Sequence, residues 1–209
     1  MVEDFFMYSN CIAILGGTFN PVHCGHVEIA DCARKQYPDI ESLVFMPNAM
    51  TYYKDGTAIA SGEDRVAMLR LATSHIEHVE ISEIELARGG ITYTIDTLEE
   101  IHAVNPGLKI YFIIGADSLA WFDNWVRFSD ILSHATILCA RRDSDLNAMQ
   151  KRAEEIISKA GHGEILFLDT PEFPVSSTEI RTRILEGKDT AGMLTTSVRD
   201  YIDEHGLYR

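Results

Sequence analysis

Residues 11–26 have the sequence CIAILGGTFNPVHCGH, which joins a short apolar run to a pair of glycines and two histidines. The apolar run Cys11–Leu15 predicts a buried strand, and helical periodicity begins at Val27. The second and third glycines of the GxGxxG fingerprint are missing, so the turn does not predict a dinucleotide-binding dehydrogenase. A glycine pair lets a ligand approach the backbone, and a helix N-terminus favours phosphate. His23 and His26 therefore predict a phosphate-binding turn.

Short runs rich in Ile, Val and Phe alternate with helical periodicity along the rest of the chain. The further strands expected are Ser42–Met46, Val79–Leu86, Lys109–Ile114, Thr136–Ala140 and Glu164–Leu168. The expected helices are Val27–Gln36, Glu63–Ser74, Ile95–Val104, Leu119–Leu132, Leu146–Ala160, Thr178–Leu185 and Ser197–His205. This alternation predicts an α/β fold with a doubly wound, mainly parallel sheet and helices on both faces. We expect a single domain over residues 1–209, with a helical C-terminal portion from about residue 176.

The composition excludes several classes of partner. Among 209 residues there are 18 Lys and Arg against 32 Asp and Glu, which gives a net charge of −14. This balance argues against binding to nucleic acid or to an anionic membrane. The N-terminus lacks a basic signal-peptide region, no apolar run spans a bilayer, and the four cysteines form no CxxC pair. We expect a cytoplasmic protein with reduced thiols that binds small molecules, and the sequence leaves a homo-oligomer open.

A second phosphate-seeking segment, VSSTEIR, ends at Arg181. Ser176 and Glu179 have the spacing of a capping box, which predicts a helix start. Ser177 and Thr178 add hydroxyls near the amides of that helix start, and Arg181 adds a fixed positive charge one turn later. Taken alone, the segment is equally typical of an N-cap beside a surface arginine. Together with the first turn, it predicts two helix starts that line one cleft.

Two pairs of histidines have HxxH spacing. For His23 and His26 the alternatives are a metal site or a purely structural role, since such spacing also occurs in metal sites. His75 and His78 lie at the end of an expected helix among glutamates, so we expect a solvated helix end there.

The chain resembles the HxGH nucleotidyltransferase superfamily and, within it, the nicotinate-nucleotide adenylyltransferases. The resemblance extends over about residues 11 to 208 and depends on several motifs taken together. These are HxGH at His23–His26, ISSTxxR at Val175–Arg181, SYTxDT at Thr92–Thr97, FIIGADSL at Phe112–Leu119 with Trp125 at family spacing, and the closing pattern at Val198–Tyr208. Two positions depart from the family: Asn20 stands where Asp is usual, and Thr51–Lys54 replaces a PPHK loop.

The resemblance implies a Rossmann-like fold and transfer of the adenylyl group of ATP to nicotinate mononucleotide, giving deamido-NAD and pyrophosphate. It implies that Mg²⁺ arrives with ATP, held mostly by substrate oxygens and water rather than by a protein metal site. The residues expected to act on the phosphates are His23, His26 and Arg181 as the catalytic group, with Lys54, Ser177, Thr178 and the backbone of Gly16, Gly17, Thr18 and Phe19.

The resemblance also implies a site for the nicotinate nucleotide. Tyr93 and Thr94 are expected to meet the carboxylate of the nicotinate, and Gly115 lies at the end of the strand that precedes Asp117. The carboxylate of Asp117 can accept hydrogen bonds from the ribose hydroxyls. The indole of Trp125 offers a flat face for the pyridine ring, and the alternative for Trp125 is a core or lid aromatic.

Two other functions stay open at this point. One is adenylyl transfer to a different acceptor, nicotinamide mononucleotide or phosphopantetheine. Phosphopantetheine enzymes resemble the chain less, because they typically have Thr where His23 stands and have shorter chains. The other is a nucleotide sensor without catalytic activity, against which the intact His23, His26 and Arg181 argue.

Overall fold

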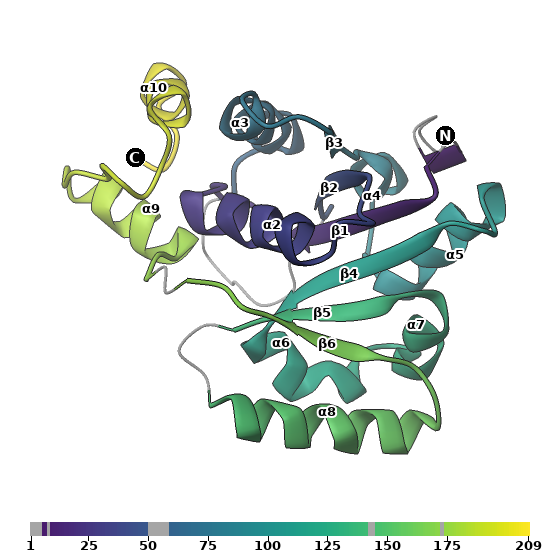
Figure 1. Cartoon of the computed structure of the whole chain (residues 1–209). Coiled ribbons are helices and arrows are strands. Elements are labelled where there is room, and N and C mark those ends of the chain that lie inside the picture. Colours follow the sequence, from purple (N-terminus) through teal and green to yellow (C-terminus); the bar gives the residue numbers. More distant parts are fainter. Residues whose placement is uncertain (1–5, 8, 50–58, 142–144, 172–173) are drawn as a thin grey trace.

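The apolar runs form one sheet of six parallel strands in the computed structural model, which describes residues 6–7, 9–49, 59–141, 145–171 and 174–209. Helices cover both faces of this sheet (Figure 1). The strand order is β3-β2-β1-β4-β5-β6, and every neighbouring pair is parallel. The strands are β1 Cys11–Gly17, β2 Ser42–Pro47, β3 Val79–Ile81, β4 Lys109–Gly115, β5 Thr136–Ala140 and β6 Ile165–Leu168. The doubly wound α/β fold expected from the sequence is confirmed.

The direction of winding changes between β1 and β4, which are neighbours in the sheet. In doubly wound sheets, ligands bind outside the carboxyl ends of the strands at such a point. The helices that surround it are α2 Cys24–Gln36, α3 Gly62–Thr73, α4 Ile84–Arg88, α5 Thr94–Val104, α6 Ala116–Trp121, the 3-10 helix η1 Phe122–Asn124, α7 Phe128–His134, α8 Leu146–Ala160, α9 Ser177–Leu185 and α10 Thr196–Glu204.

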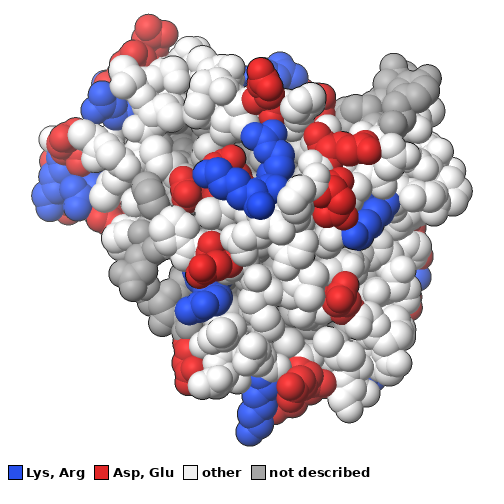
Figure 2. Space-filling model, viewed as in Figure 1, with Lys and Arg blue, Asp and Glu red and all other residues white. Residues whose placement is uncertain are grey.

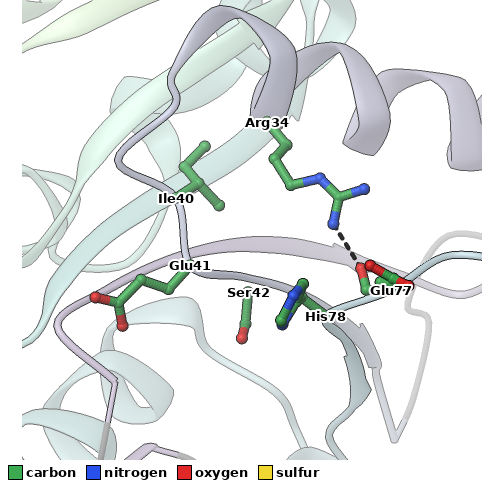
Figure 3. Close-up of a pocket in the computed structure, with 6 residues that line it drawn as sticks. All are labelled: Arg34, Ile40, Glu41, Ser42, Glu77 and His78. Atoms are coloured by element: carbon green, nitrogen blue, oxygen red, sulfur yellow. Dashed lines mark hydrogen bonds between the residues drawn. The ribbon is translucent and has the colours of Figure 1, made fainter.

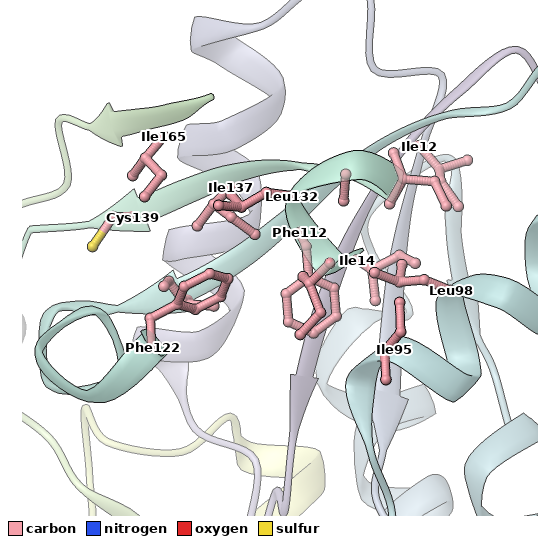
Figure 4. Packing of buried hydrophobic residues seen from close by; sticks show 14 of the residues in the cluster. Ile12, Ile14, Ile95, Leu98, Phe112, Phe122, Leu132, Ile137, Cys139 and Ile165 are labelled. Atoms are coloured by element: carbon pink, nitrogen blue, oxygen red, sulfur yellow. The ribbon is translucent and has the colours of Figure 1, made fainter. Parts of the chain in front are cut away.

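Each face of the sheet has its own hydrophobic core, because successive side chains of a strand point to opposite faces. In β1, Ile12 and Ile14 join one cluster and Ala13 and Leu15 join the other. The first cluster contains residues of α5, η1 and α7 (Figure 4). The second contains residues of α2, α3, α9 and α10. Strands buried on both faces explain why the strand segments of the sequence are continuously apolar.

Two of the expected elements are interrupted in the structure. The expected strand Val79–Leu86 ends at Ile81, and α4 begins three residues later. The amide of Ile84 donates to the Ser82 hydroxyl (3.4 Å), a local turn that competes with strand pairing. The expected helix Leu119–Leu132 is broken into α6, η1 and α7. The gap before α7 contains Trp125 in an extended conformation (ψ 144°) and Arg127 with a left-handed φ of 54°, and an α-helix contains neither.

Helix α2 begins at Cys24 rather than at Val27, so His26 lies within its first turn. Across the described part of the chain, every helix is too short or too polar to cross a membrane. Acidic and basic side chains intermingle over the face shown in Figure 2. The net negative charge is therefore not gathered into a single patch on that face.

A prediction for the fold concerns two glycines between α8 and β6. Both have left-handed φ, 79° at Gly161 and 98° at Gly163, but a Cβ at Gly163 would lie 2.6 Å from the Cβ of Leu132. Gly161 has open space around it. Gly163→Ala is therefore expected to lower the free energy of unfolding by about 1–3 kcal/mol more than Gly161→Ala does. Urea unfolding of the two variants checks this, and equal losses would contradict it.

Candidate active site

The turn after β1 folds back on itself at the carboxyl end of the sheet. Phe19 is 2% exposed and has a left-handed φ of 49°. Its ring meets the His26 ring edge-on, with centroids 5.0 Å apart. A Cβ at Gly17 would lie 3.2–3.4 Å from three atoms of the Phe19 ring. A side chain at Gly17 would therefore press on the Phe19 ring where it returns over the end of the strand.

The two histidines of this turn lie together at the start of α2. His23 is the N-cap residue of α2 and is 3% exposed. Its backbone amide donates to Nδ1 of His26 (3.2 Å), and the two rings stack with centroids 3.7 Å apart. Because Nδ1 of His26 accepts this bond, its neutral ring carries the proton on Nε2. Two imidazoles therefore lie at the positive end of a 13-residue helix, where an anion is stabilised.

The C-terminal segment reaches the same turn. The Ser177 hydroxyl donates to the carbonyl of Pro21 (2.9 Å), and the Arg181 guanidinium donates to the carbonyl of Asn20 (2.7 Å) and to the Thr178 hydroxyl (3.2 Å). The structure thus brings together the two motifs, which are more than 150 residues apart in the sequence.

The helix start in this segment is confirmed, since the Ser176 side chain accepts from the amide of Glu179. Burial lowers the pKa of Arg181, which is 9% exposed. The guanidinium of Arg181 holds the turn in place, and its contact with the phosphates of ATP stays a prediction.

Sequence analysis missed a second arginine beneath the turn. Arg65 lies in α3 and is 3% exposed. Its guanidinium donates to the carbonyls of Thr18 (2.9 Å), Asn48 (2.9 Å) and Ala60 (3.2 Å). Burial lowers its pKa. The available signal was a cation in a helix whose neighbouring positions are apolar: Arg65 is followed three and four residues later by the buried Met68 and Leu69.

Asn20, the first departure from the family pattern, has a structural role. Its side chain is buried and its Oδ1 accepts from the backbone amide of Ala60 (3.0 Å). An amide oxygen can accept this bond as a carboxylate oxygen would. The second departure, Thr51–Lys54, lies outside the described residues, and so does the expected phosphate contact of Lys54.

The residues expected to bind the nicotinate nucleotide lie beyond the neighbouring strand. Gly115 ends β4 and Asp117 is exposed in the first turn of α6. Tyr93 is the N-cap residue of α5 and Thr94 is its first residue. Gly115 and Asp117 thus lie at the carboxyl end of β4, and Tyr93 and Thr94 lie at the start of α5. The contacts of these residues with a substrate stay predictions.

Trp125 is half-buried and packs on the core below it. Its ring lies edge-on to Phe112, with centroids 6.5 Å apart, and tilted against Phe122 at 5.2 Å. Trp121, in contrast, is 69% exposed. Trp125 therefore packs against the core, which was the alternative role for it, and part of its own surface is exposed, where a ring can stack.

A buried carboxyl joins α4 to the start of α5. Glu85 is 7% exposed, and burial raises its pKa to about 7. The Thr97 hydroxyl donates to Glu85 (2.9 Å) and accepts from the Arg88 guanidinium (3.0 Å). These bonds bridge the turn Gly89–Tyr93, whose two glycines have left-handed φ of 64° and 72°. The turn is thereby held where Tyr93 caps the start of α5.

Features elsewhere in the described residues do not join this site. His75 and His78 are exposed, as expected for a solvated helix end. An open pocket is lined by six residues, and Arg34 donates to the carbonyl of Glu77 across it (2.5 Å, Figure 3). Ser42 begins β2 and His78 precedes β3, so this pocket lies at the amino ends of the strands, opposite the site. Its lining is Arg34, Ile40, Glu41, Ser42, Glu77 and His78.

Comparisons with known proteins agree with this geometry. A model of the cytidylyltransferase-like family matches residues 14–183. The probable nicotinate-nucleotide adenylyltransferase of Desulfitobacterium hafniense is 36% identical and covers 95% of each chain, and that of Lachnoclostridium phytofermentans is 37% identical and covers 94% of this chain and 98% of its own. A structure of Plasmodium falciparum nicotinic acid mononucleotide adenylyltransferase complexed with NaAD has a TM-score of 0.78 at 16% identity, covering 95% of this chain and 97% of its own. That likeness supports the fold.

A prediction for the site concerns Glu85. Its pKa rises from 4.5 in the unfolded chain to about 7 in the folded protein, so its contribution to stability is full below pH 4.5 and is lost as the pH rises through 7. At about 1.4 kcal/mol per pKa unit, the loss is roughly 3 kcal/mol. Glu85→Gln keeps an acceptor for Thr97 without the charge. We therefore expect the free energy of unfolding of Glu85→Gln, relative to wild type, to be higher at pH 8 than at pH 5.

Urea unfolding of wild type and Glu85→Gln at the two pH values measures this effect. Glu77→Gln, at an exposed carboxylate, is the matched control. If the difference in the free energy of unfolding between wild type and Glu85→Gln is the same at both pH values, ionisation of Glu85 does not destabilise the protein.

Proposed function

We infer that this chain, which belongs to the nicotinate-nucleotide adenylyltransferase family, transfers the adenylyl group of ATP to nicotinate mononucleotide, giving deamido-NAD and pyrophosphate. It is a nucleotidyltransferase of NAD biosynthesis. The observation that carries this inference is the junction of the two phosphate-seeking motifs, where Ser177 and Arg181 donate to the carbonyls of Pro21 and Asn20. A cytoplasmic location is part of the same proposal.

The reaction is a displacement at phosphorus. An oxygen of the 5′-phosphate of nicotinate mononucleotide attacks the α-phosphorus of ATP, and the bond to the β-phosphate breaks, which releases pyrophosphate. The nucleophile is already ionised, so no general base and no covalent intermediate on the protein are needed. The protein must align the two substrates and balance the charge on the phosphates.

The side of the site that faces the phosphates is suited to balancing their negative charge. We assign His23 and His26, stacked at the start of α2, to the α- and β-phosphates of ATP. Arg181 supplies positive charge from the start of α9, and Ser177 and Thr178 lie beside it. The backbone of Gly16–Phe19 borders this end of the sheet and can approach the nucleotide closely.

Mg²⁺ enters this proposal as part of the substrate, MgATP. The groups gathered at the turn are imidazoles, a guanidinium and backbone amides, which bind anionic oxygens rather than Mg²⁺. Within the described ranges, no group of three His, Cys, Asp or Glu side chains could hold a metal ion. We therefore propose that phosphate oxygens and water hold Mg²⁺.

The start of α5 favours nicotinate as the acceptor. Its first amides lie at the positive end of an 11-residue helix, where a carboxylate is stabilised more than an uncharged carboxamide is. Tyr93 and Thr94 stand at this end, and Trp125 offers its ring to the pyridine. We propose that this helix end selects nicotinate mononucleotide over nicotinamide mononucleotide.

Pyrophosphate release with MgATP tests the function. Nicotinate mononucleotide is expected to be turned over at least about ten-fold better than nicotinamide mononucleotide, a difference worth about 1.4 kcal/mol. Comparable turnover of the two would mean that α5 does not select the carboxylate. Turnover with phosphopantetheine alone would identify another acceptor, and no turnover with any acceptor would favour a nucleotide sensor.

Replacement of His23 tests the phosphate assignment. His23→Ala is expected to lower kcat/KM by the equivalent of about 2–4 kcal/mol, the range for one preorganised donor. His23→Asn keeps a residue suited to the N-cap and is expected to lose as much activity. His75→Ala, in the exposed HxxH pair, is the matched control. Near-normal kcat/KM in both His23 variants would remove this histidine from the catalytic group.

A further inference from the structure

The segment from Phe122 to Arg127 contains η1, leads into α7 and carries Trp125. Two backbone bonds shape it: the amide of Trp125 donates to the carbonyl of Phe122 (3.0 Å), and the amide of Phe128 donates to the carbonyl of Trp125 (3.2 Å). Trp125 thus lies between a short helix and the start of the next one. The position of its ring depends on what holds the end of this segment.

Arg127 holds that end. It is the N-cap residue of α7 and has φ 54° and ψ 42°, a left-handed conformation that is unfavourable for a residue other than glycine. Such a conformation persists only where the surroundings impose it. At Arg127 they do, because its guanidinium makes three hydrogen bonds with carboxylates.

Two of these bonds cross from the Trp125 segment to α5, and the third stays within α7. Two nitrogens of the Arg127 guanidinium donate to the two carboxylate oxygens of Glu99, at 2.6 and 3.1 Å, and its Nε donates to Asp130 (2.6 Å). A two-pronged bond of this kind fixes direction as well as distance. The arginine keeps the pKa of the Glu99 carboxyl below its usual value, so the pair stays charged into mildly acidic conditions.

Helix α5 is also the element whose first residues, Thr94 and its neighbours, are assigned to the nicotinate carboxylate. Glu99 lies on the same helix, five residues after Thr94. Beneath them, Ile95 and Leu98 of α5 share one core cluster with Phe112 and Phe122 (Figure 4). The Arg127–Glu99 pair therefore connects α5 to the Trp125 segment at the surface, and the apolar side chains of the core cluster pack beneath it.

We propose that Arg127 and Glu99 form a positioning pair that sets the separation between the Trp125 ring and the start of α5, and so determines how well the nicotinate ring and its carboxylate are bound together. The pair touches neither substrate. This inference rests on the proposed function, since it deepens the description of the acceptor site.

A different role, that of an ordinary surface salt bridge, predicts other results. Exposed ion pairs contribute little to stability, and Arg127 and Glu99 are each nearly half exposed. A surface pair would change neither the binding of the acceptor nor the environment of Trp125. The positioning role changes both and leaves the ATP side alone.

The experiment uses the full chain with Trp121→Phe as the parent, so that Trp125 is the one remaining tryptophan of the two in the sequence. Arg127→Asn removes the guanidinium and its two hydrogen bonds with Glu99 but suits a left-handed backbone. Glu99→Gln removes the negative charge at nearly constant shape. Both variants, the double variant and Arg127→Lys are compared with the parent. The measurements are KM for each substrate, kcat, and the fluorescence anisotropy and acrylamide quenching of Trp125.

Each single variant is expected to raise KM for nicotinate mononucleotide by about three- to ten-fold, with KM for ATP within two-fold of the parent. The double variant is expected to be no worse than either single variant, because the two residues act as one unit. Arg127→Lys should recover part of the loss, since it keeps the charge without the fork. In the two single variants, lower anisotropy and stronger quenching of Trp125 should accompany the change in KM.

Arg70→Ala is the control, because Arg70 forms an exposed ion pair with Glu83 (2.7 Å) in another part of the chain. It should leave all the measured quantities as in the parent. Unchanged KM for nicotinate mononucleotide and unchanged Trp125 fluorescence in the Arg127 and Glu99 variants would overturn the proposal, and so would equal changes in both KM values. If the parent itself shows no turnover with nicotinate mononucleotide, the proposed function fails, and unchanged Trp125 fluorescence in the variants would still overturn the pair.

Discussion

The backbone carbonyls of the turn after β1 need hydrogen-bond donors that the sheet cannot supply, because the strand has ended and the helix has not begun. Arg65 from α3 donates to Thr18, while Arg181 and Ser177 from α9 donate to Asn20 and Pro21. The conformation of the turn, and with it the placing of both histidines, depends on these donors. Elements from the first and last thirds of the chain thereby meet at one point.

The same donors influence the electrostatics of the site. The hydrogen bonds of Arg65 and Arg181 go to uncharged carbonyl and hydroxyl oxygens, so these bonds do not neutralise the two charges. Burial weakens the screening of such charges by water. A chain with a net charge of −14 can therefore offer a positive potential to a polyphosphate at the end of β1. The composition describes the average surface, whereas the site depends on a few buried cations.

Local sequence patterns predicted the parts of the structure that depend on local physics. The strands of the sheet and the capped start of α9 followed from apolar runs and from the Ser176–Glu179 spacing. The break before α7 did not, because the left-handed conformation of Arg127 is imposed by contacts with α5 that helical periodicity does not contain. Arg65 was missed for the same reason, since its partners lie in other segments of the chain.

The junction between the two motifs also has a consequence for synthesis of the chain. A ribosome makes the β1 turn early, but the residues that donate to its carbonyls come more than 150 positions later. All six strands are made before Ser177 and Arg181, so the turn after β1 lacks these donors until α9 has been synthesised. A product that stops before α9 therefore contains all six strands but lacks the two donors that α9 directs to the turn after β1.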